Sequence, residues 1–299
     1  MRGLSLIVTK QEINSDSSKK FYSHIQKNSF DHLAINTIFE QLLFALHQCS
    51  ALHALTKVPC KSDIVRVGIV SWYYGIYAAA SAMVAAQDGS FQNDHTTTAK
   101  SWDRQIAANN LIVHPFNLRI TTLIEKDSKA QLKKLTSDAK IKCKSSLIGK
   151  PLQSLDEAYS ACHAYLSGTV NWSRWNANEA LKSSKDFKEL GVSNFRTKKA
   201  ISFRDKHLEK KKVGFLHQAL RYRGKANYRD SIFIGYGKNT EKALNTYPDD
   251  LSCVLDAFVC QAGIFCSRRL GEELWNTFLT DLAKNRSFSL CPHIIWGNL

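Results

Sequence analysis

The stretch Val70-Ser-Trp-Tyr-Tyr-Gly-Ile-Tyr-Ala-Ala-Ala-Ser-Ala-Met-Val84 decides the fold that we expect. It lies within a longer apolar segment, from Ile64 to about Gln87, in which large aliphatic and aromatic residues recur at helical spacing. Small alanines beside large aromatic residues allow two helices to approach closely. The stretch therefore predicts a long buried helix, with Ser62 or Asp63 as its N-cap.

The same helical period recurs along most of the chain. We expect further helices over residues 33–55, 94–106, 199–223 (one basic amphipathic helix), 249–266 and 270–282. Residues 4–13 are predicted to form one strand or an extended arm, and residues 231–236 are the other candidate strand. The sequence thus predicts a mostly α protein.

The middle of the chain differs in composition from both ends, because lysines gather there and the apolar period weakens. We interpret residues 115–199 as an inserted, lysine-rich helical subdomain. It interrupts a discontinuous helical bundle made of residues 29–114 and 200–285. In this division, residues 1–28 are an N-terminal arm and residues 286–299 are a C-terminal tail.

The composition favours a polyanionic partner. The 299 residues carry a formal net charge of +15, which favours RNA or DNA first and an acidic membrane surface second. A solvated lysine-rich face that serves solubility is an equally good explanation. The eight cysteines form no CxxC pair and no signal peptide precedes them, so we expect free thiols in a cytoplasmic protein. No uncharged apolar run reaches the roughly 18 residues of a membrane span.

Positive charge is densest between residues 210 and 229. The candidate nucleic-acid-binding residues there are Lys210, Lys211, Lys212, His217, Arg221, Arg223, Lys225 and Arg229. Cations at this density repel one another unless water or an anionic partner compensates them. The competing interpretation is a solvated helix face whose long side chains cover apolar surface.

Three short motifs together resemble the HEPN superfamily of helical proteins. They are the Tyr73-Tyr74 helix with its alanines, the Asp94-His95 pair, and the segment Arg223-Gly-Lys-Ala-Asn-Tyr228. The resemblance implies a helical bundle, a prokaryotic toxin–antitoxin or antiviral defence setting, and a homodimer or larger assembly. It implies no cofactor and no metal site.

Ribonuclease members of that superfamily carry an arginine, a polar residue and then a histidine. By resemblance, Arg223 would bind the scissile phosphate and Tyr228 would orient it. His95, or alternatively His217, would then carry the proton. Here Gly224 occupies the polar position and Tyr228 stands where a histidine is expected. A tyrosine, with an ordinary pKa near 10, is a poor general base at pH 7.

Two functional hypotheses follow. The first is a weakly catalytic or non-catalytic subunit that binds nucleic acid, which the missing histidine favours. The alternative is an active metal-independent ribonuclease that uses Arg223. A third interpretation, in which the charge serves only solubility, predicts no salt-sensitive binding.

Three weaker patterns remain. Arg286 to His293 repeats the arginine-to-histidine spacing, but Pro292 makes a rigid helical site there a poor prospect. Cys49 and His53 could share a metal ion, although we favour half-buried core residues. The patch from Trp172 to Trp175 could stack on bases, and we slightly favour a place in the core of the subdomain instead.

Overall fold

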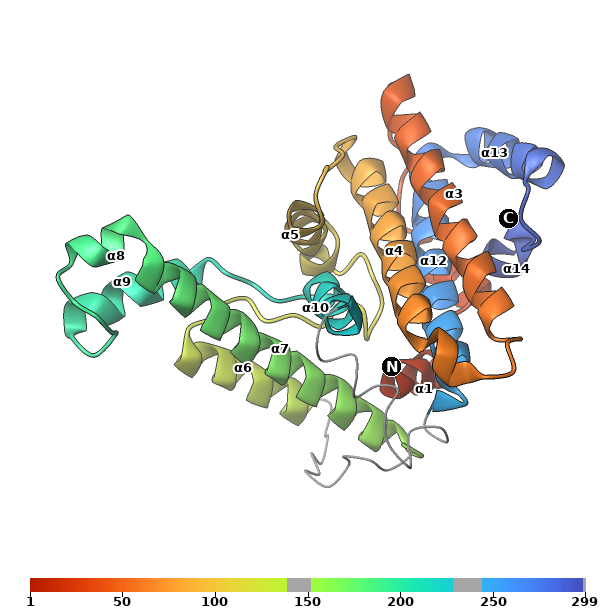
Figure 1. The fold of residues 1–299 in the computed structure, drawn as a ribbon. Helices are drawn as coiled ribbons and strands as arrows, with labels where there is room; N and C mark the ends of the chain where they lie inside the picture. Colours follow the sequence, from red (N-terminus) through yellow and green to blue (C-terminus); the bar gives the residue numbers. More distant parts are fainter. Residues whose placement is uncertain (139–151, 228–243, 298–299) are drawn as a thin grey trace.

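The computed structural model describes residues 1–138, 152–227 and 244–297. Those residues are mostly helical, and their only β pairing is an isolated bridge, so the predicted mostly α character is confirmed (Figure 1). The candidate strand at residues 231–236 lies outside the described residues.

The elements follow in chain order. They are α1 (Arg2–Lys10), α2 (Ser15–Phe21), α3 (His32–Leu55), α4 (Lys61–Asp88), α5 (His95–Gln105), η1 (Ala107–Asn109), α6 (Glu125–Asp138), α7 (Leu155–Ser183), α8 (Lys185–Glu189), α9 (Lys198–Glu209), α10 (Phe215–Asn227), α12 (Tyr247–Leu270), α13 (Glu272–Asn285) and α14 (Pro292–Trp296).

Helix α4 lies at the centre of the bundle, as the alanine- and aromatic-rich stretch predicts. It packs against α3, α5, α10 and α12, and buried residues occur on each of its faces. A helix that is apolar all round is stable only when other helices cover it. The expected N-cap was wrong, because the helix begins at Lys61 after Cys60, which places Asp63 in the first turn. A carboxylate there stabilises the positive end of the helix dipole.

Gly75 allows α4 to approach its neighbours closely. A Cβ atom at this position would lie 2.7 Å from Leu255 Cδ1 of α12 and 3.0 Å from Gln48 Cβ of α3. Nearby, the Ser71 hydroxyl donates a hydrogen bond of 2.6 Å to Gln48 Oε1, which pairs the polar groups of α3 and α4. The smallest residue in the quoted stretch therefore sets the spacing of three core helices.

By length and composition, α4 and α12 are the two described helices that could each cross a membrane. In the bundle, however, 78% and 89% of their apolar windows are buried. The core helices of soluble proteins pass the same test, so these helices are only weak evidence for a membrane span.

The strand predicted at residues 4–13 was wrong, because residues 2–10 form helix α1. Leu4, Ile7 and Val8 are spaced three and four apart, which is a helical period, and Ile7 and Val8 are buried. The β-branched residues Ile7, Val8 and Thr9 suggested a strand, but packing against α7 and α12 favours the helix. A Cβ atom on Gly3 would lie 2.9 Å from the carbonyl oxygen of Ala158, so this glycine permits close packing of α1 on α7.

The single helix predicted over residues 199–223 was also wrong, because the chain breaks between α9 and α10. At the break, Val213 pairs with Ile120 in an antiparallel bridge, with N···O distances of 2.8 and 2.9 Å. Just before it, the Leu123 amide donates to the Leu208 carbonyl at 3.0 Å. This pairing places Lys210, Lys211 and Lys212 in an exposed turn instead of on a helix face.

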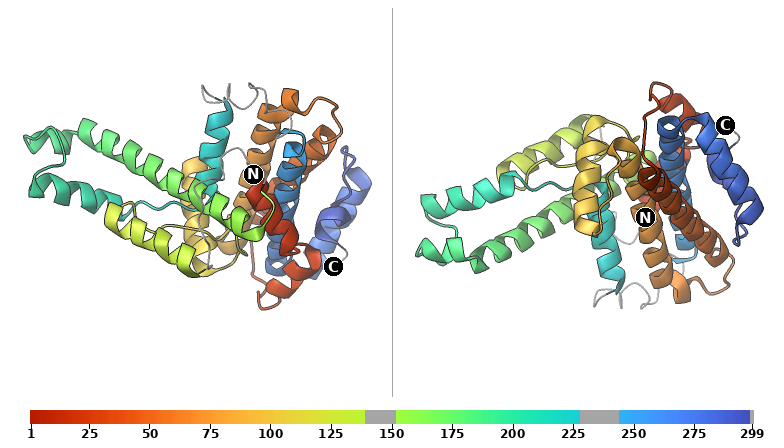
Figure 2. Two further views of the ribbon diagram at one scale, coloured as in Figure 1. Left: turned by 90° about the horizontal axis from the view of Figure 1, so that it is seen from below. Right: turned by 90° about the horizontal axis from the view of Figure 1, so that it is seen from above.

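Helices α6, α7, α8 and α9 form an elongated arm that projects from the bundle (Figures 1 and 2). The arm has its own small apolar cluster, made of Ile120, Leu123, Leu132, Leu166, Val170, Ala177, Leu208 and Val213. Helix α7 joins the arm to the bundle through contacts with α1 and α10. The cluster extends beyond the predicted limits of 115–199, and an inserted origin for this segment stays a prediction.

The two ends of the chain pack onto the bundle. Helix α2 contacts α12, where Tyr22 packs against Phe265. At the other end Trp296 of α14 is fully buried, and its Nε1 donates to the carbonyl oxygen of Val259 at 3.0 Å. Residues 1–28 and 292–296 thus add to the core.

Candidate nucleic-acid interface

A basic groove lies where the arm meets the bundle. It has a volume of about 830 Å³ and is bordered by α5, α7, the turn at residues 210–212 and the start of α10. Its cationic lining residues are Lys100, Arg104, Lys210, Lys211 and Lys212. Three of these are predicted nucleic-acid-binding residues. Lys100 and Arg104 were missed, although their spacing of four places them on one face of α5.

Local structure fixes both sides of the groove. Asp94 caps α5, because its side chain accepts hydrogen bonds from the amides of Thr96 and Thr97 at 2.9 Å. Thr96 and Thr97 themselves line the groove. On the other side, the bridge between Val213 and Ile120 holds the lysine turn in place.

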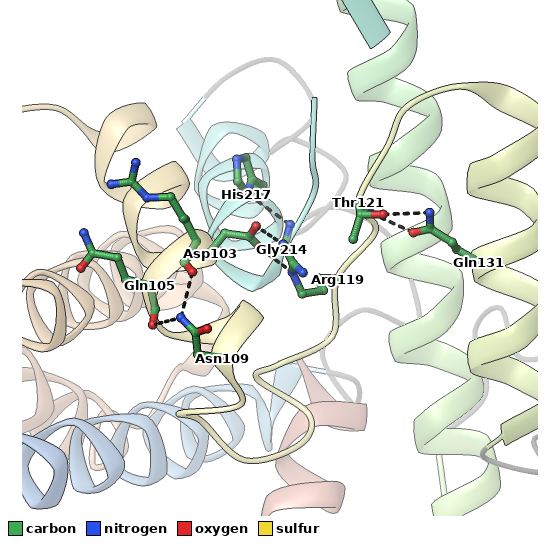
Figure 3. Close-up of polar contacts among 9 residues, drawn as sticks. Asp103, Gln105, Asn109, Arg119, Thr121, Gln131, Gly214 and His217 are labelled. Carbon is green, nitrogen blue, oxygen red and sulfur yellow. Dashed lines mark hydrogen bonds and ion pairs between the residues drawn. The ribbon is translucent and has the colours of Figure 1, made fainter. Parts of the chain in front are cut away.

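An ion pair at the groove joins α5 to the segment that leads into the arm (Figure 3). Arg119 donates two hydrogen bonds to the buried carboxylate of Asp103, at 2.6 and 3.1 Å. Gly214 fits against this carboxylate, since a Cβ atom would lie 2.6 Å from Asp103 Oδ1. The Gly214 amide donates to His217 Nδ1 at 3.2 Å. The ion pair of Asp103 and Arg119 therefore lies directly against Gly214, where α10 begins.

The groove keeps an uncompensated positive charge. Asp103, the one carboxylate that the described residues place in its lining, is already paired with Arg119. Among the ion pairs of residues 1–138, 152–227 and 244–297, none involves the five cations of the groove. Burial lowers the pKa of His217, and the charge of Lys100 lowers it further, although Asp103 opposes both. His217 is therefore mostly neutral at pH 7 and contributes shape more than charge.

An exposed aromatic ring forms part of the groove wall. Trp172 of α7 is 46% exposed, and Trp175, one turn further on, is 61% exposed. Placing this patch in the core of the subdomain was therefore wrong. Arg221 of α10 lies over the Trp172 ring at 5.4 Å and over the Tyr165 ring at 5.7 Å. Arg174 is used within the arm, where it donates to the carbonyl oxygen of Leu123 at 2.9 Å.

Arg223 and His95 meet at a cluster of tyrosines on α4. The Arg223 guanidinium lies 5.2 Å from the Tyr73 ring centre and 5.6 Å from that of Tyr74. The His95 ring contacts the same two rings at 5.4 and 5.8 Å, and that of Tyr77 at 4.4 Å. The structure therefore brings together two of the three predicted catalytic residues, although they are separated by more than a hundred positions.

Both residues have polar atoms without a hydrogen-bond partner. Arg223 Nε and His95 Nδ1 are buried and unpaired within the described part of the chain. Burial lowers the pKa of His95, and the charge of Arg223 lowers it further, while Asp94 raises it. The imidazole is therefore neutral at pH 7 and can accept a proton. Burial raises the pKa of Tyr73 despite the nearby Arg223, so this phenol stays protonated.

The remaining predicted residues do not all join one site. Arg221 faces the arm, where it donates to Thr169 Oγ1 at 3.0 Å. Lys225 lies over the Tyr165 ring at 5.9 Å. Tyr228 and Arg229 lie outside the described residues. The tyrosine cluster is a feature that sequence reasoning missed: the tyrosines mark the family resemblance, but nothing in their spacing showed that they receive Arg223 and His95.

The two weaker alternatives lie elsewhere. His53 Nε2 pairs with Asp256 Oδ2 at 2.7 Å, which joins α3 to α12. In the parts of the chain that are described, no three His, Cys, Asp or Glu side chains gather as metal ligands would. Arg286 and His293 each bond to a nearby backbone carbonyl, of Ala283 and Gly297 respectively.

Comparisons with family models, with curated proteins and with solved structures find no match for this chain. The proposals below therefore rest on its own residues and geometry.

Proposed function

We propose that this chain is a HEPN-like protein that binds a single strand of RNA or DNA in its basic groove. One observation carries the proposal: five cations that make no ion pair within the described residues lie beside an exposed tryptophan. Phosphates would neutralise the cations, and a base would stack on the ring. We further propose a weakly catalytic or non-catalytic subunit of a cytoplasmic homodimer or larger assembly. The family resemblance suggests a prokaryotic defence or toxin–antitoxin setting.

The tryptophan supports a single strand over a duplex. Bases stacked within a duplex offer no free face to a protein ring, whereas unpaired bases stack readily on aromatic side chains. Arg221 lies against the Trp172 ring, and the ring is still 46% exposed. An arginine on such a ring also adds a cation–π contact to the stack.

Binding of labelled single-stranded RNA, single-stranded DNA and duplex DNA tests the proposal directly. We expect Trp172→Ala to weaken single-strand binding by about 1–3 kcal/mol, which is roughly 5- to 150-fold. Trp175→Ala is the matched control, because Trp175 is equally part of α7 and exposed but does not line the groove. Equal losses in both variants, or tighter binding of the duplex, would contradict the proposal.

A metal-independent ribonuclease is the second candidate, and the shared tyrosine cluster of Arg223 and His95 favours it. Neutral His95 would accept the proton of a ribose 2′-hydroxyl as that oxygen attacks the adjacent phosphorus. Arg223 would stabilise the negative charge that develops on the phosphate oxygens. The 5′-oxygen would leave with a proton from water or a second acid, and a 2′,3′-cyclic phosphate would remain.

Cleavage assays separate the two candidates. Wild-type protein, Arg223→Ala and His95→Gln are incubated with an RNA strand and with its 2′-deoxy counterpart. Cleavage of the RNA alone, lost in both variants, would establish the ribonuclease. Salt-sensitive binding without cleavage would support the binding subunit. If neither signal appears, both candidates fail and an acidic protein partner becomes the next hypothesis.

A further inference from the structure

A second cavity lies apart from the groove, at the joint between arm and bundle. It has a volume of about 170 Å³, and residues of α1, α4, α7 and α10 line it. None of its lining residues borders the basic groove. The proposal for this cavity therefore does not rest on the nucleic-acid proposal.

Aromatic rings form much of its wall. Phe215, Trp72, Tyr222 and Tyr165 make a chain of edge-to-face contacts, with ring centres 6.4, 5.9 and 5.7 Å apart in that order. All four line the cavity. Rings arranged in this way offer both faces and edges, which suits a planar aromatic guest.

Two hydrogen-bonding groups on this wall lack partners. Trp72 Nε1 and the Tyr165 hydroxyl are buried, and neither has a hydrogen-bond partner within the described residues. Trp72 as a whole is 2% exposed. A buried indole N–H can only donate, and leaving it unpaired costs stability. A guest with an acceptor atom would satisfy it.

Among the described residues, no Asp, Glu, Lys or Arg side chain lines the cavity. The α-amino group of Met1, which also lines it, is buried, and burial lowers its pKa and so favours its neutral form. Burial raises the pKa of Cys162 to about 11 and that of Tyr222 to about 12, so both stay protonated at neutral pH. A charged guest would lose its hydration without gaining a counter-charge from any of these side chains.

We propose that this cavity is a binding site for a small, neutral, planar aromatic molecule that carries a hydrogen-bond acceptor. An apolar cavity of about 150 Å³ in another protein holds benzene, so the volume here suits one ring or two fused rings. The guest would lie between α4 and α10 of the bundle and α7 of the arm, and would bind them together.

Two probes of nearly equal size test the chemistry. Benzimidazole has an acceptor nitrogen, whereas indole has only a donor. We expect calorimetry or ligand-observed NMR to give a Kd on the order of 1 mM or tighter for benzimidazole, and weaker binding for indole. The Trp72→Phe variant keeps a ring but removes the donor, and should reduce this difference. Failure of both probes to bind the wild-type protein would overturn the proposal.

A matched pair of variants tests the location. Ala161 of α7 lines the cavity, so Ala161→Phe should fill it and weaken benzimidazole binding at least tenfold. Ala164 lies one turn further along α7, is exposed and does not line the cavity, so Ala164→Phe should leave binding unchanged. Circular dichroism confirms that each variant is folded. Unchanged binding in folded Ala161→Phe, or equal losses in both variants, would also overturn the proposal.

Discussion

The lysine turn at residues 210–212 gives the sharpest test of the groove. The perturbation is the triple variant Lys210→Ala, Lys211→Ala and Lys212→Ala. These side chains are exposed and make no ion pair within the described residues. Their removal should therefore change nucleic-acid binding without unfolding the protein.

The magnitude follows from counterion release. On a single strand, each neutralised phosphate contributes about 0.7 to the slope of log affinity against log salt. Five groove cations then give a slope of about −3.5, and the two that remain in the variant give about −1.4. Between about 50 and 200 mM salt, wild-type affinity should fall roughly 130-fold and that of the variant about sevenfold.

Fluorescence anisotropy with a labelled single-stranded RNA measures both slopes. The control variant is Lys126→Ala, Lys133→Ala and Lys134→Ala, which removes the same charge from exposed positions of α6 outside the groove. The control should keep the wild-type slope. If both triple variants flatten the slope equally, the charge acts as a diffuse field and the groove does not bind phosphates.

Two further predictions concern stability. Gly214→Ala should destabilise the protein by about 1–3 kcal/mol in urea unfolding, because the new Cβ would lie 2.6 Å from Asp103 Oδ1. Gly224 lies within α10, and a Cβ atom there would meet no described atom within 4 Å, so Gly224→Ala should instead stabilise the protein by roughly 0.5–1 kcal/mol. The opposite order of the two stabilities would refute the packing argument. The hydrogen bond to Asp256 raises the pKa of His53 in the folded protein. The contribution of this hydrogen bond to stability is therefore complete below the pKa of His53 in the unfolded chain, near 6.5. It is lost as the pH rises through the higher pKa of His53 in the folded protein. The melting temperature of wild-type protein should exceed that of Asp256→Asn by more at pH 5.5 than at pH 9, and a gap that widens with pH would contradict this.

The long core helices could be predicted from the sequence because their own residues decide them. Around Trp72 and Ile76, apolar residues occur on every face of the helix. They can all be buried only if the helix lies at the centre of the bundle. Asp94 likewise signals the start of α5 by itself, since a capping side chain acts on the next three residues.

Other features depend on contacts between distant segments. Residues 4–13 have both strand-forming composition and helical spacing, and packing against α7 and α12 selects the helix. The break before α10 depends on the pairing of Val213 with Ile120, more than ninety positions away.

In the candidate site, too, some features follow from local sequence and others depend on contacts between distant segments. The lysines of the turn could be named as candidates from residue type, and Arg223 and His95 from the resemblance stated above. Their arrangement could not, because the aromatic cluster that joins Arg223 to His95 comes from a third helix. Trp172 was assigned to the core since tryptophans are on average highly buried, and only the packing of the arm leaves it exposed.

Photochemical crosslinking tests the central claim most directly. A single-stranded RNA that carries 5-iodouridine is irradiated with the wild-type protein, and the crosslinked peptides are identified by mass spectrometry. Binding in the groove predicts crosslinks at Trp172 and in the peptides that contain residues 210–212. Crosslinks confined to α3 and α13, on the far side of the bundle from the arm (Figure 1), would contradict the account.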